Sequence, residues 1–281
     1  MSIDHHYGNN LQQQQALLSE LRSACPNGAD AWQLAPIDQL HTGGLQASLH
    51  LRDTLAACLA SQPAPRILDA GSGAGGLLRL LAQLPGADVT GLDLCHNLNR
   101  LSLALCQLYQ PPCYLMQVSG DAHCMPFASD HFDAIVLQHS LLNMPNPDQA
   151  LDECLRVLRP GGHLVLHELI QGPAPAQMQF PVPWAREPEQ SHLHSAGTLS
   201  ARLQARGFQI RTTTDLTAST LAWRQRQDNR PQAQTFRLTP ALILGPDFPL
   251  MFANLLHNLR HGAVGVMQYL ASKPASDPRL R

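Results

Sequence analysis

The sequence is almost free of lysine. Of its nineteen basic residues only Lys273 is a lysine, the arginines are scattered along the chain, and the formal net charge is -2. No basic stripe of the kind that follows a phosphate backbone is visible, so we expect no nucleic-acid partner. Because 44% of the residues are hydrophobic, the composition also excludes a disordered polyelectrolyte and indicates a globular protein.

Cysteine pairs, export signals and long apolar runs are absent as well. The seven cysteines include no C-x-x-C pair, and the pairs His5–His6 and His192–His194 have no convincing third ligand, so we expect neither a disulfide framework nor a metal. The stretch Met1–Gln15 is polar, and no segment approaches the ~20 apolar residues of a membrane span. These absences predict a protein of the reducing cytoplasm without a membrane segment.

Short β-type runs alternate with helical patterns through most of the chain. This alternation predicts an α/β fold with a doubly wound sheet, right-handed crossovers and helices on both faces. The expected strands are 66–69, 88–93, 114–118, 132–138, 163–169, 207–210 and 263–270. The expected helices are 44–59, 75–84, 96–109, 148–158 and 195–206.

Two segments depart from this alternation. Residues 1–43 mix polar runs with short apolar pieces, and residues 171–195 are rich in proline and glycine without a helical period. We interpret the first as an N-terminal helical cap and the second as a lid segment. The predicted organisation is therefore a cap at 1–43, a cofactor-binding core at 44–170, a lid at 171–195, and the remainder of the core with a helical insertion at 196–281.

The most informative motif is the glycine loop between the first expected strand and the helix after it. Gly71, Gly73 and Gly76 satisfy G-x-G-x-x-G in a strand-turn-helix context, where missing side chains let a ligand approach the backbone. The pattern suits nicotinamide and flavin dinucleotides as well as S-adenosylmethionine. Spacing alone therefore does not choose between these cofactors.

Charge separates them better, because a dinucleotide brings a pyrophosphate to this loop whereas S-adenosylmethionine brings an ammonium and a sulfonium. Asp69 precedes the first glycine, where a carboxylate favours a cationic ligand. Asp93 ends the next strand and suits the hydroxyls of a ribose in either cofactor class. Asp121 follows the third strand, where its carboxylate is placed for an adenine amino group. The three acids favour S-adenosylmethionine.

These residues resemble the class I S-adenosylmethionine-dependent methyltransferases from residue 41 to residue 215. The motifs that carry the resemblance are 67–75, 89–93, 120–122, 132–136 and 156–162. The resemblance implies a Rossmann-like seven-stranded sheet with an antiparallel last strand. It also implies cofactor contacts, at Asp69, Gly71, Gly73, Asp93, Leu94, Asp121, Ala122 and Gln138, the last near the methionine end.

The segment 41–45 is further similar to the small-molecule branch that includes sarcosine and dimethylglycine methyltransferases, in which the N-terminal region folds over the cofactor. The chain departs from the glycine-betaine enzymes in its proline-rich 171–188 segment. The expected partner is thus a small-molecule acceptor with a nitrogen or oxygen nucleophile. The sequence does not name that acceptor, and it gives no oligomeric state.

Three residues are candidates for the chemistry at the acceptor. His139 follows the fourth strand beside Gln138, where an imidazole is placed to take a proton from the acceptor. Asn143, four residues later, is placed to orient the acceptor, although its surroundings also suit an ordinary turn. Tyr7 contributes only if the N-terminus closes over the site. His167 and Glu168 end the fifth strand, where alternation allows one of the two to face the cavity.

Three other functions remain compatible with the same motifs. A cyclase would attack another carbon of the sulfonium and convert the aminobutyrate arm to azetidine-2-carboxylate, leaving methylthioadenosine. A regulatory protein would bind the cofactor and leave it intact. A nicotinamide oxidoreductase would use the glycine loop for its dinucleotide.

Overall fold

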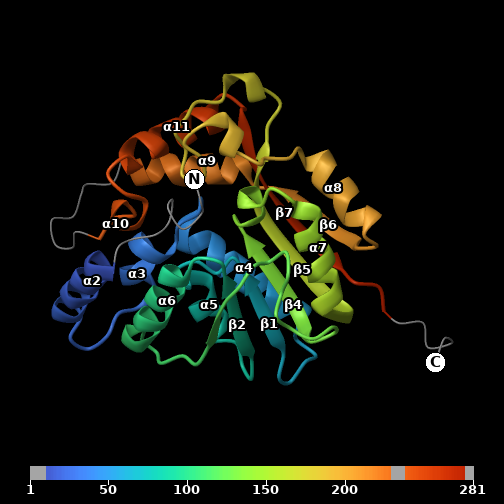
Figure 1. Ribbon diagram of the computed structural model, residues 1–281, viewed down its shortest axis with the longest axis horizontal. Helices are drawn as coiled ribbons and strands as arrows, with labels where there is room; N and C mark the ends of the chain where they lie inside the picture. Colours follow the sequence, from blue (N-terminus) through green and yellow to red (C-terminus); the bar gives the residue numbers. More distant parts are fainter. Residues whose placement is uncertain (1–10, 229–237, 276–281) are drawn as a thin grey trace.

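A computed structural model describes residues 11–228 and 238–275, and its centre is one seven-stranded sheet with the order β3-β2-β1-β4-β5-β7-β6 (Figure 1). The strands are β1 (Arg66–Ala70), β2 (Asp88–Asp93), β3 (Met116–Ser119), β4 (Phe132–Gln138), β5 (Leu158–Gln171), β6 (Gln209–Asp215) and β7 (Val264–Ser272). Neighbouring strands are parallel except that β7 runs antiparallel to both β5 and β6. The predicted α/β sheet with an antiparallel last strand is therefore confirmed.

Helices cover both faces of the sheet. The longer ones are α2 (Leu11–Ala24), α3 (Ala31–Asp38), α4 (Gly44–Cys58), α5 (Gly76–Leu81), α6 (His96–Leu108), α7 (Pro147–Val157), α8 (Ala196–Ala205), α9 (Thr217–Asp228) and α11 (Phe248–Arg260), with the short α10 (Ala241–Leu244) before α11. Leu68 and Ile135 pack in one apolar cluster with α7 and α8, whereas Ile67 and Val136 pack in another with α4 and α5. Successive strand residues thus serve opposite layers, which explains why β4 is buried along its whole length.

The helices before β1 are held over the glycine loop. Leu21 of α2 and Leu34 of α3 pack against Leu101 of α6. Asp38, at the end of α3, accepts a 2.8 Å ion-pair hydrogen bond from Arg79 of α5, and both side chains are buried. Figure 1 shows α2, α3 and α6 side by side at one end of the molecule. Long-range contacts, rather than the polar character of this segment, therefore fix its position.

The predicted lid segment contains two single 3-10 turns, η2 (Pro175–Gln177) and η3 (Pro188–Gln190), and between them a tight turn closed by a bridge between Val182 and Ala185. It is tied to α11 by side-chain amides: Asn254 Nδ2 donates to the Pro181 carbonyl at 2.9 Å, and Asn258 Nδ2 donates to the Gln179 carbonyl at 2.9 Å. Val182 and Trp184 are buried in a cluster with Leu255. The segment is packed against the C-terminal helices.

Several element ends differ from the sequence prediction. The third strand begins at Met116 rather than Tyr114, and α5 ends at Leu81 rather than Leu84, where turn hydrogen bonds replace the helical pattern. Strand β5 begins five residues earlier than predicted. Its first part gains partners because Gly161 N donates to the Lys273 carbonyl and Lys273 N donates to the Gly162 carbonyl, both at 3.0 Å. Pairing with β7, which lies far away in the sequence, thus lengthens the strand.

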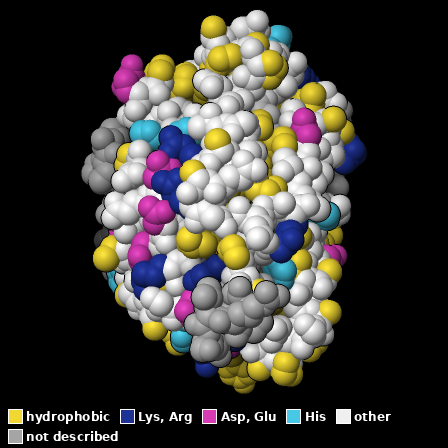
Figure 2. All heavy atoms as spheres, turned by 90° about the vertical axis from the view of Figure 1, so that its right-hand side faces the viewer, with side chains coloured by type: hydrophobic (Ala, Val, Ile, Leu, Met, Phe, Trp, Pro, Cys, Tyr) yellow, Lys and Arg dark blue, Asp and Glu magenta, His cyan; other side chains and the backbone are white. Residues whose placement is uncertain are grey.

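The surface carries both signs of charge. On the face in Figure 2, basic and acidic side chains are interspersed and no stripe of one sign forms. Arg202 of α8 and Arg206, the residue after this helix, both pair with Asp148 of α7, which is one such mixed cluster. In the described part of the chain, no helix is both long and apolar enough to cross a bilayer.

Candidate functional site

A cavity of about 390 Å³ opens at the carboxyl ends of β1, β2 and β4. This is the edge at which open α/β sheets bind ligands. Ten of the predicted site residues line this cavity: Asp69, Gly71, Gly73, Asp93, Leu94, Asp121, Ala122, Gln138, His139 and Asn143. The two candidates at the end of the fifth strand, His167 and Glu168, do not. Tyr7 lies outside the described residues. The prediction that the strand ends converge on one cavity therefore agrees with the geometry.

The glycine loop closes against the loop that follows β4. Gly71 has φ +84°, and an added Cβ there would lie 2.3 Å from Ser140 Cβ, so both the backbone angle and the space require glycine. Ser140 Oγ in turn donates to the Ala70 carbonyl at 2.8 Å. At Gly73, with φ +53°, an added Cβ would meet nothing within 4 Å. The backbone of Gly73 is therefore open to a ligand.

Asp93 is fixed at the mouth of the cavity by the backbone around it. Its Oδ2 accepts from Gly73 N at 2.8 Å, and its Oδ1 accepts from Cys95 N at 2.8 Å. The first hydrogen bond ties the glycine loop to β2, and the second lies at the start of α6. Each carboxylate oxygen can accept further hydrogen bonds. The side chain is thus oriented before any ligand arrives.

Asp69 lies deeper, with only 2% of its surface exposed. Burial, assisted by the negative charge of Asp93, raises its pKa to about 8. The acid is therefore largely protonated at neutral pH when no cation lies beside it. A cation bound beside it would favour the carboxylate, because opposite charge stabilises the ionised form.

Asp121 lies at the opening of the cavity and is held by fewer backbone hydrogen bonds than Asp93. Its Oδ1 accepts from His123 N at 2.9 Å and lies 2.6 Å from His123 Nδ1, while half of the side chain is exposed. Ala122, next in the chain, is buried against the apolar cluster of β2 and β4. This corner combines an exposed carboxylate with an apolar surface, which suits the edge and face of a heterocyclic base.

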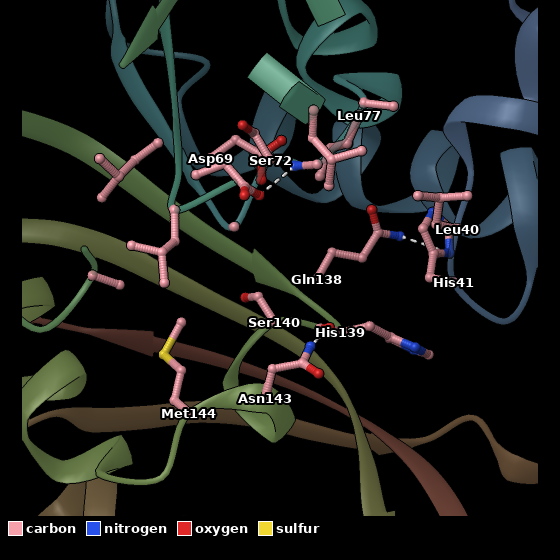
Figure 3. Close-up of a pocket in the computed structure, with 18 of the residues that line it drawn as sticks. Leu40, His41, Asp69, Ser72, Leu77, Gln138, His139, Ser140, Asn143 and Met144 are labelled. Atoms are coloured by element: carbon pink, nitrogen blue, oxygen red, sulfur yellow. Dashed lines mark hydrogen bonds between the residues drawn. The ribbon is translucent and has the colours of Figure 1, made fainter. Parts of the chain in front are cut away.

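Three histidines form a row beside Gln138, and two of them, His41 and His139, line the cavity. The His139 ring stacks on His167 with centroids 5.3 Å apart, and it lies 5.7 Å from the His41 ring. Burial lowers the pKa of His41 to about 4 and that of His167 to about 3, and it holds the pKa of His139 well below its usual value. All three imidazoles are therefore neutral at physiological pH. Figure 3 shows His41 and Gln138 turned toward each other, with Gln138 Nε2 3.3 Å from His41 Nδ1.

His139 itself sits in a constrained position. It has φ +51°, in the left-handed region that few residues other than glycine adopt. Its Nε2 lies 3.3 Å from Thr42 Oγ1, and Asn143 Nδ2 donates to its carbonyl at 3.3 Å. The surrounding contacts hold a conformation that costs about 1–3 kcal/mol, as is common at functional sites.

Glu168 binds the backbone of the loop that follows β4 and carries His139. Its Oε1 accepts from Ser140 N at 3.0 Å and from Leu141 N at 2.9 Å, while burial raises its pKa to about 8. His167 points to the other face of β5, where it stacks on His139. The strand alternation expected for this pair is present, but neither side chain lines the cavity. Both residues position the loop that carries His139.

A second, smaller cavity lies beyond the histidines. It shares Leu40, His41 and His139 with the larger one. Its remaining walls are apolar apart from Thr42, and they include Leu142, Leu169, Trp184, Phe252 and Leu255. Trp184 belongs to the lid predicted at 171–195, whereas the sequence prediction did not place Thr42, Phe252 or Leu255 at a cavity. The only sequence signal for these was the 41–45 motif and the apolar spacing of 248–259.

Over residues 11–228 and 238–275, no group of three or more histidine, cysteine, aspartate or glutamate side chains is arranged to hold a metal ion. The histidine row does not form such a group.

Comparisons with known proteins extend these observations. Residues 68–166 match a family described as a methyltransferase domain. The ubiquinone/menaquinone biosynthesis C-methyltransferase UbiE of Cereibacter sphaeroides is 34% identical over 125 residues, which cover 44% of this chain and 50% of that protein. The chain thus spans about half the length of the curated relatives it matches.

Solved structures match over a larger share of the chain but at low identity. The 4+2 cyclase SpnF has a TM-score of 0.64 and 23% identity, covering 94% of this chain and 97% of its own. Phosphoethanolamine N-methyltransferase 2 of Haemonchus contortus, solved with S-adenosyl-L-methionine, has a TM-score of 0.71 and 17% identity, covering 98% of this chain and 60% of its own. At these identities the structures show a shared fold. One of them is named a cyclase, so the fold alone does not fix the reaction.

Proposed function

Because the chain contains a methyltransferase domain of the class I, S-adenosylmethionine-dependent type, we propose that it transfers the methyl group of this cofactor to a small molecule. The charge of the larger cavity carries the proposal. Its described lining includes Asp93 and Asp121, Asp69, whose carboxylate form a bound cation favours, and Asp38, which pairs with Arg79, but no lysine or arginine. A pyrophosphate would be repelled there, whereas an ammonium and a sulfonium are stabilised.

The residues of the cavity fit the parts of the cofactor in the order expected from the strands. We assign Asp69 to the ammonium, Asp93 to the ribose hydroxyls, and Asp121 with Ala122 to the adenine. Gln138, which faces the inner end, is assigned to the methionine part. When bound, S-adenosylmethionine supplies a methyl group that its sulfonium has already activated, so the protein has to bind, align and exclude water.

The backbone of the glycine loop also takes part in cofactor binding in this proposal. Gly71 and Gly73 allow the cofactor to lie against the loop, and Leu94 offers an apolar contact at the mouth, where it is 47% exposed. We further propose that residues 1–43 act as a cap and residues 171–195 as a lid. Tyr7 belongs to that cap as a candidate contact with the acceptor.

His139 and Asn143 are assigned to the acceptor. The neutral imidazole of His139 can accept a proton from an acceptor hydroxyl or amine, while Asn143 holds the His139 carbonyl and orients the loop. Nitrogen and oxygen nucleophiles suit this arrangement. A carbon nucleophile, the type named for the curated C-methyltransferases, would lose its proton to the same imidazole.

The reaction is tested by incubating the purified protein with S-adenosylmethionine alone and identifying nucleosides by mass. We expect the cofactor to stay intact, and S-adenosylhomocysteine to form only after a small-molecule extract is added. The Asp93→Ala protein is the control, because it should form none. Methylthioadenosine produced without an acceptor would contradict methyl transfer. It would support the cyclisation, in which the amine nitrogen of the cofactor attacks its own γ-carbon.

Cofactor binding is expected to depend on pH through Asp69. In the free protein this acid keeps its proton up to a pKa of about 8, and the cationic cofactor favours the carboxylate, so binding releases a proton below that pH. Affinity should therefore rise as pH increases from 6 and level off near 8. Titration calorimetry in buffers of different ionisation enthalpy measures the released proton. Asp69→Asn should bind without releasing it; a wild-type affinity independent of pH would count against the assignment.

A further inference from the structure

Two cysteine thiols, Cys106 and Cys113, lie side by side at the edge of the sheet that ends in β3. Cys106 is in the last turn of α6, and Cys113 lies three residues before β3. Their Sγ atoms are 2.9 Å apart, and both residues are free, half-buried cysteines. The sulfurs of a disulfide are about 2.05 Å apart, so these two need to approach by less than about 1 Å to be joined.

A fixed turn brings the two cysteines together. Tyr109, directly after α6, is buried in the apolar cluster that joins α6 to the N-terminal helices, whereas Pro111 and Pro112 are exposed. The two prolines cannot continue a helix, so the chain reverses after α6 and returns to its last turn. There Cys106 Sγ also donates to the Cys113 carbonyl at 3.3 Å. The pair is not visible in the sequence because the two cysteines are seven positions apart.

The surroundings of the pair make its two thiols unequal. The hydrogen bond with Cys113 lowers the pKa of Cys106 to about 7 against the opposing effect of burial, and the positive charge of Arg79 lowers it further. The same hydrogen bond raises the pKa of Cys113. The thiolate is the reactive form of cysteine, so Cys106 is the nucleophile of the pair. Neither cysteine lines the two cavities described above, and no third metal ligand joins them in the described part of the chain.

We propose that Cys106 and Cys113 form a reversible disulfide, with a small-molecule disulfide such as oxidised glutathione as the oxidant. The Cys106 thiolate attacks one sulfur of the oxidant, which forms a mixed disulfide and releases the first small thiol. Cys113 then gives up its proton and attacks the Cys106 sulfur, which releases the second small thiol. The protein loses two hydrogens and two electrons, and the oxidant is reduced to two thiols.

The disulfide closes a short loop around the junction that holds the N-terminal helices. Ala29, between α2 and α3, donates from its backbone N to the Leu108 carbonyl at 2.7 Å, and Gln110 N donates to the Ala29 carbonyl at 2.9 Å. Leu108 and Gln110 both lie between Cys106 and Cys113 in the chain. Oxidation therefore restrains the segment on which α2 and α3 are anchored, and reduction releases it.

Treatment of the purified protein with excess oxidised glutathione, followed by alkylation, intact mass and peptide mapping, tests the pair. We expect one disulfide, between Cys106 and Cys113, which dithiothreitol reverses. Cys113→Ser should stop at a glutathione mixed disulfide on Cys106. Cys58→Ser is the matched control, because Cys58 is another half-buried thiol, at the end of α4, and its loss should leave the disulfide intact. An oxidised wild type without a protein disulfide, or with one between other cysteines, would overturn the proposal.

The effect on the fold is measured by thermal unfolding of the reduced and the oxidised protein. A cross-link restricts the unfolded chain, so the oxidised wild type should unfold about 3–6 °C higher. Hydrogen exchange should slow at the Ala29 and Gln110 amides, which lie at the junction. Cys106→Ser, treated in the same way, should show neither change. No rise in the unfolding temperature of the oxidised wild type, or unchanged exchange at both amides, would contradict a restrained junction.

Discussion

Replacing Asp93 with alanine is expected to weaken binding of S-adenosylmethionine by at least about 100-fold. The substitution removes the carboxylate that we assign to the two ribose hydroxyls, and each of these charge-assisted hydrogen bonds is worth about 1.5–3 kcal/mol. The substitution also releases the backbone on both sides. Gly73 N and Cys95 N each lose a carboxylate acceptor at 2.8 Å, so the glycine loop and the start of α6 are no longer tied to β2. Titration calorimetry measures the dissociation constant.

The control for this variant is Asp88→Ala. Asp88 begins the same strand, is exposed, and lies at the edge of the sheet away from the cavity. Its replacement should leave cofactor affinity unchanged. If the Asp93 variant also binds with wild-type affinity, the assignment of this carboxylate to the ribose is wrong.

The second large effect is expected on stability, from Arg79→Met. The Arg79 side chain is 1% exposed, pairs with Asp38 at 2.8 Å, and donates to the Ala74 carbonyl at 2.9 Å. Burial already raises the pKa of Asp38 in spite of Arg79, so removing the guanidinium leaves a buried acid without its counter-charge. We expect the free energy of unfolding to fall by about 3–5 kcal/mol, as when other buried ion pairs lose one partner.

Arg52→Met provides the matched comparison. Arg52 pairs with Asp53 at 2.7 Å, but the two side chains are 30% and 64% exposed. Solvent screens such a pair, so its loss should cost less than about 1 kcal/mol. Urea unfolding of the three proteins gives the two differences. Similar losses in both variants would show that the Asp38–Arg79 pair does not anchor α3 to the glycine loop.

The larger cavity was accessible from the sequence because it depends on local rules. Asp69 is the penultimate residue of β1, Asp93 ends β2, and Asp121 lies two residues after β3, and the carboxyl ends of parallel strands share one edge. Their convergence on one cavity therefore follows from the strand order. The family match confirms the predicted methyltransferase domain and S-adenosylmethionine as its methyl donor.

The smaller cavity was not accessible in the same way. Thr42 and His139 are 97 residues apart in the chain, and Phe252 and Leu255 reach this cavity only because α11 packs on the segment around Trp184. Apolar periodicity predicts that such residues are buried, but not which cavity they face. For the same reason, the sequence indicated that one of His167 and Glu168 would enter the cavity, whereas both lie behind His139.

The two cavities draw on different stretches of the chain. Every residue that lines the larger one lies between Asp38 and Pro145, whereas Pro183, Trp184, Phe252 and Leu255 of the smaller cavity come after the fifth strand. Substitutions at these four positions can therefore reshape the smaller cavity while every residue that lines the larger one stays unchanged. A chain divided in this way can vary one cavity in evolution and conserve the other.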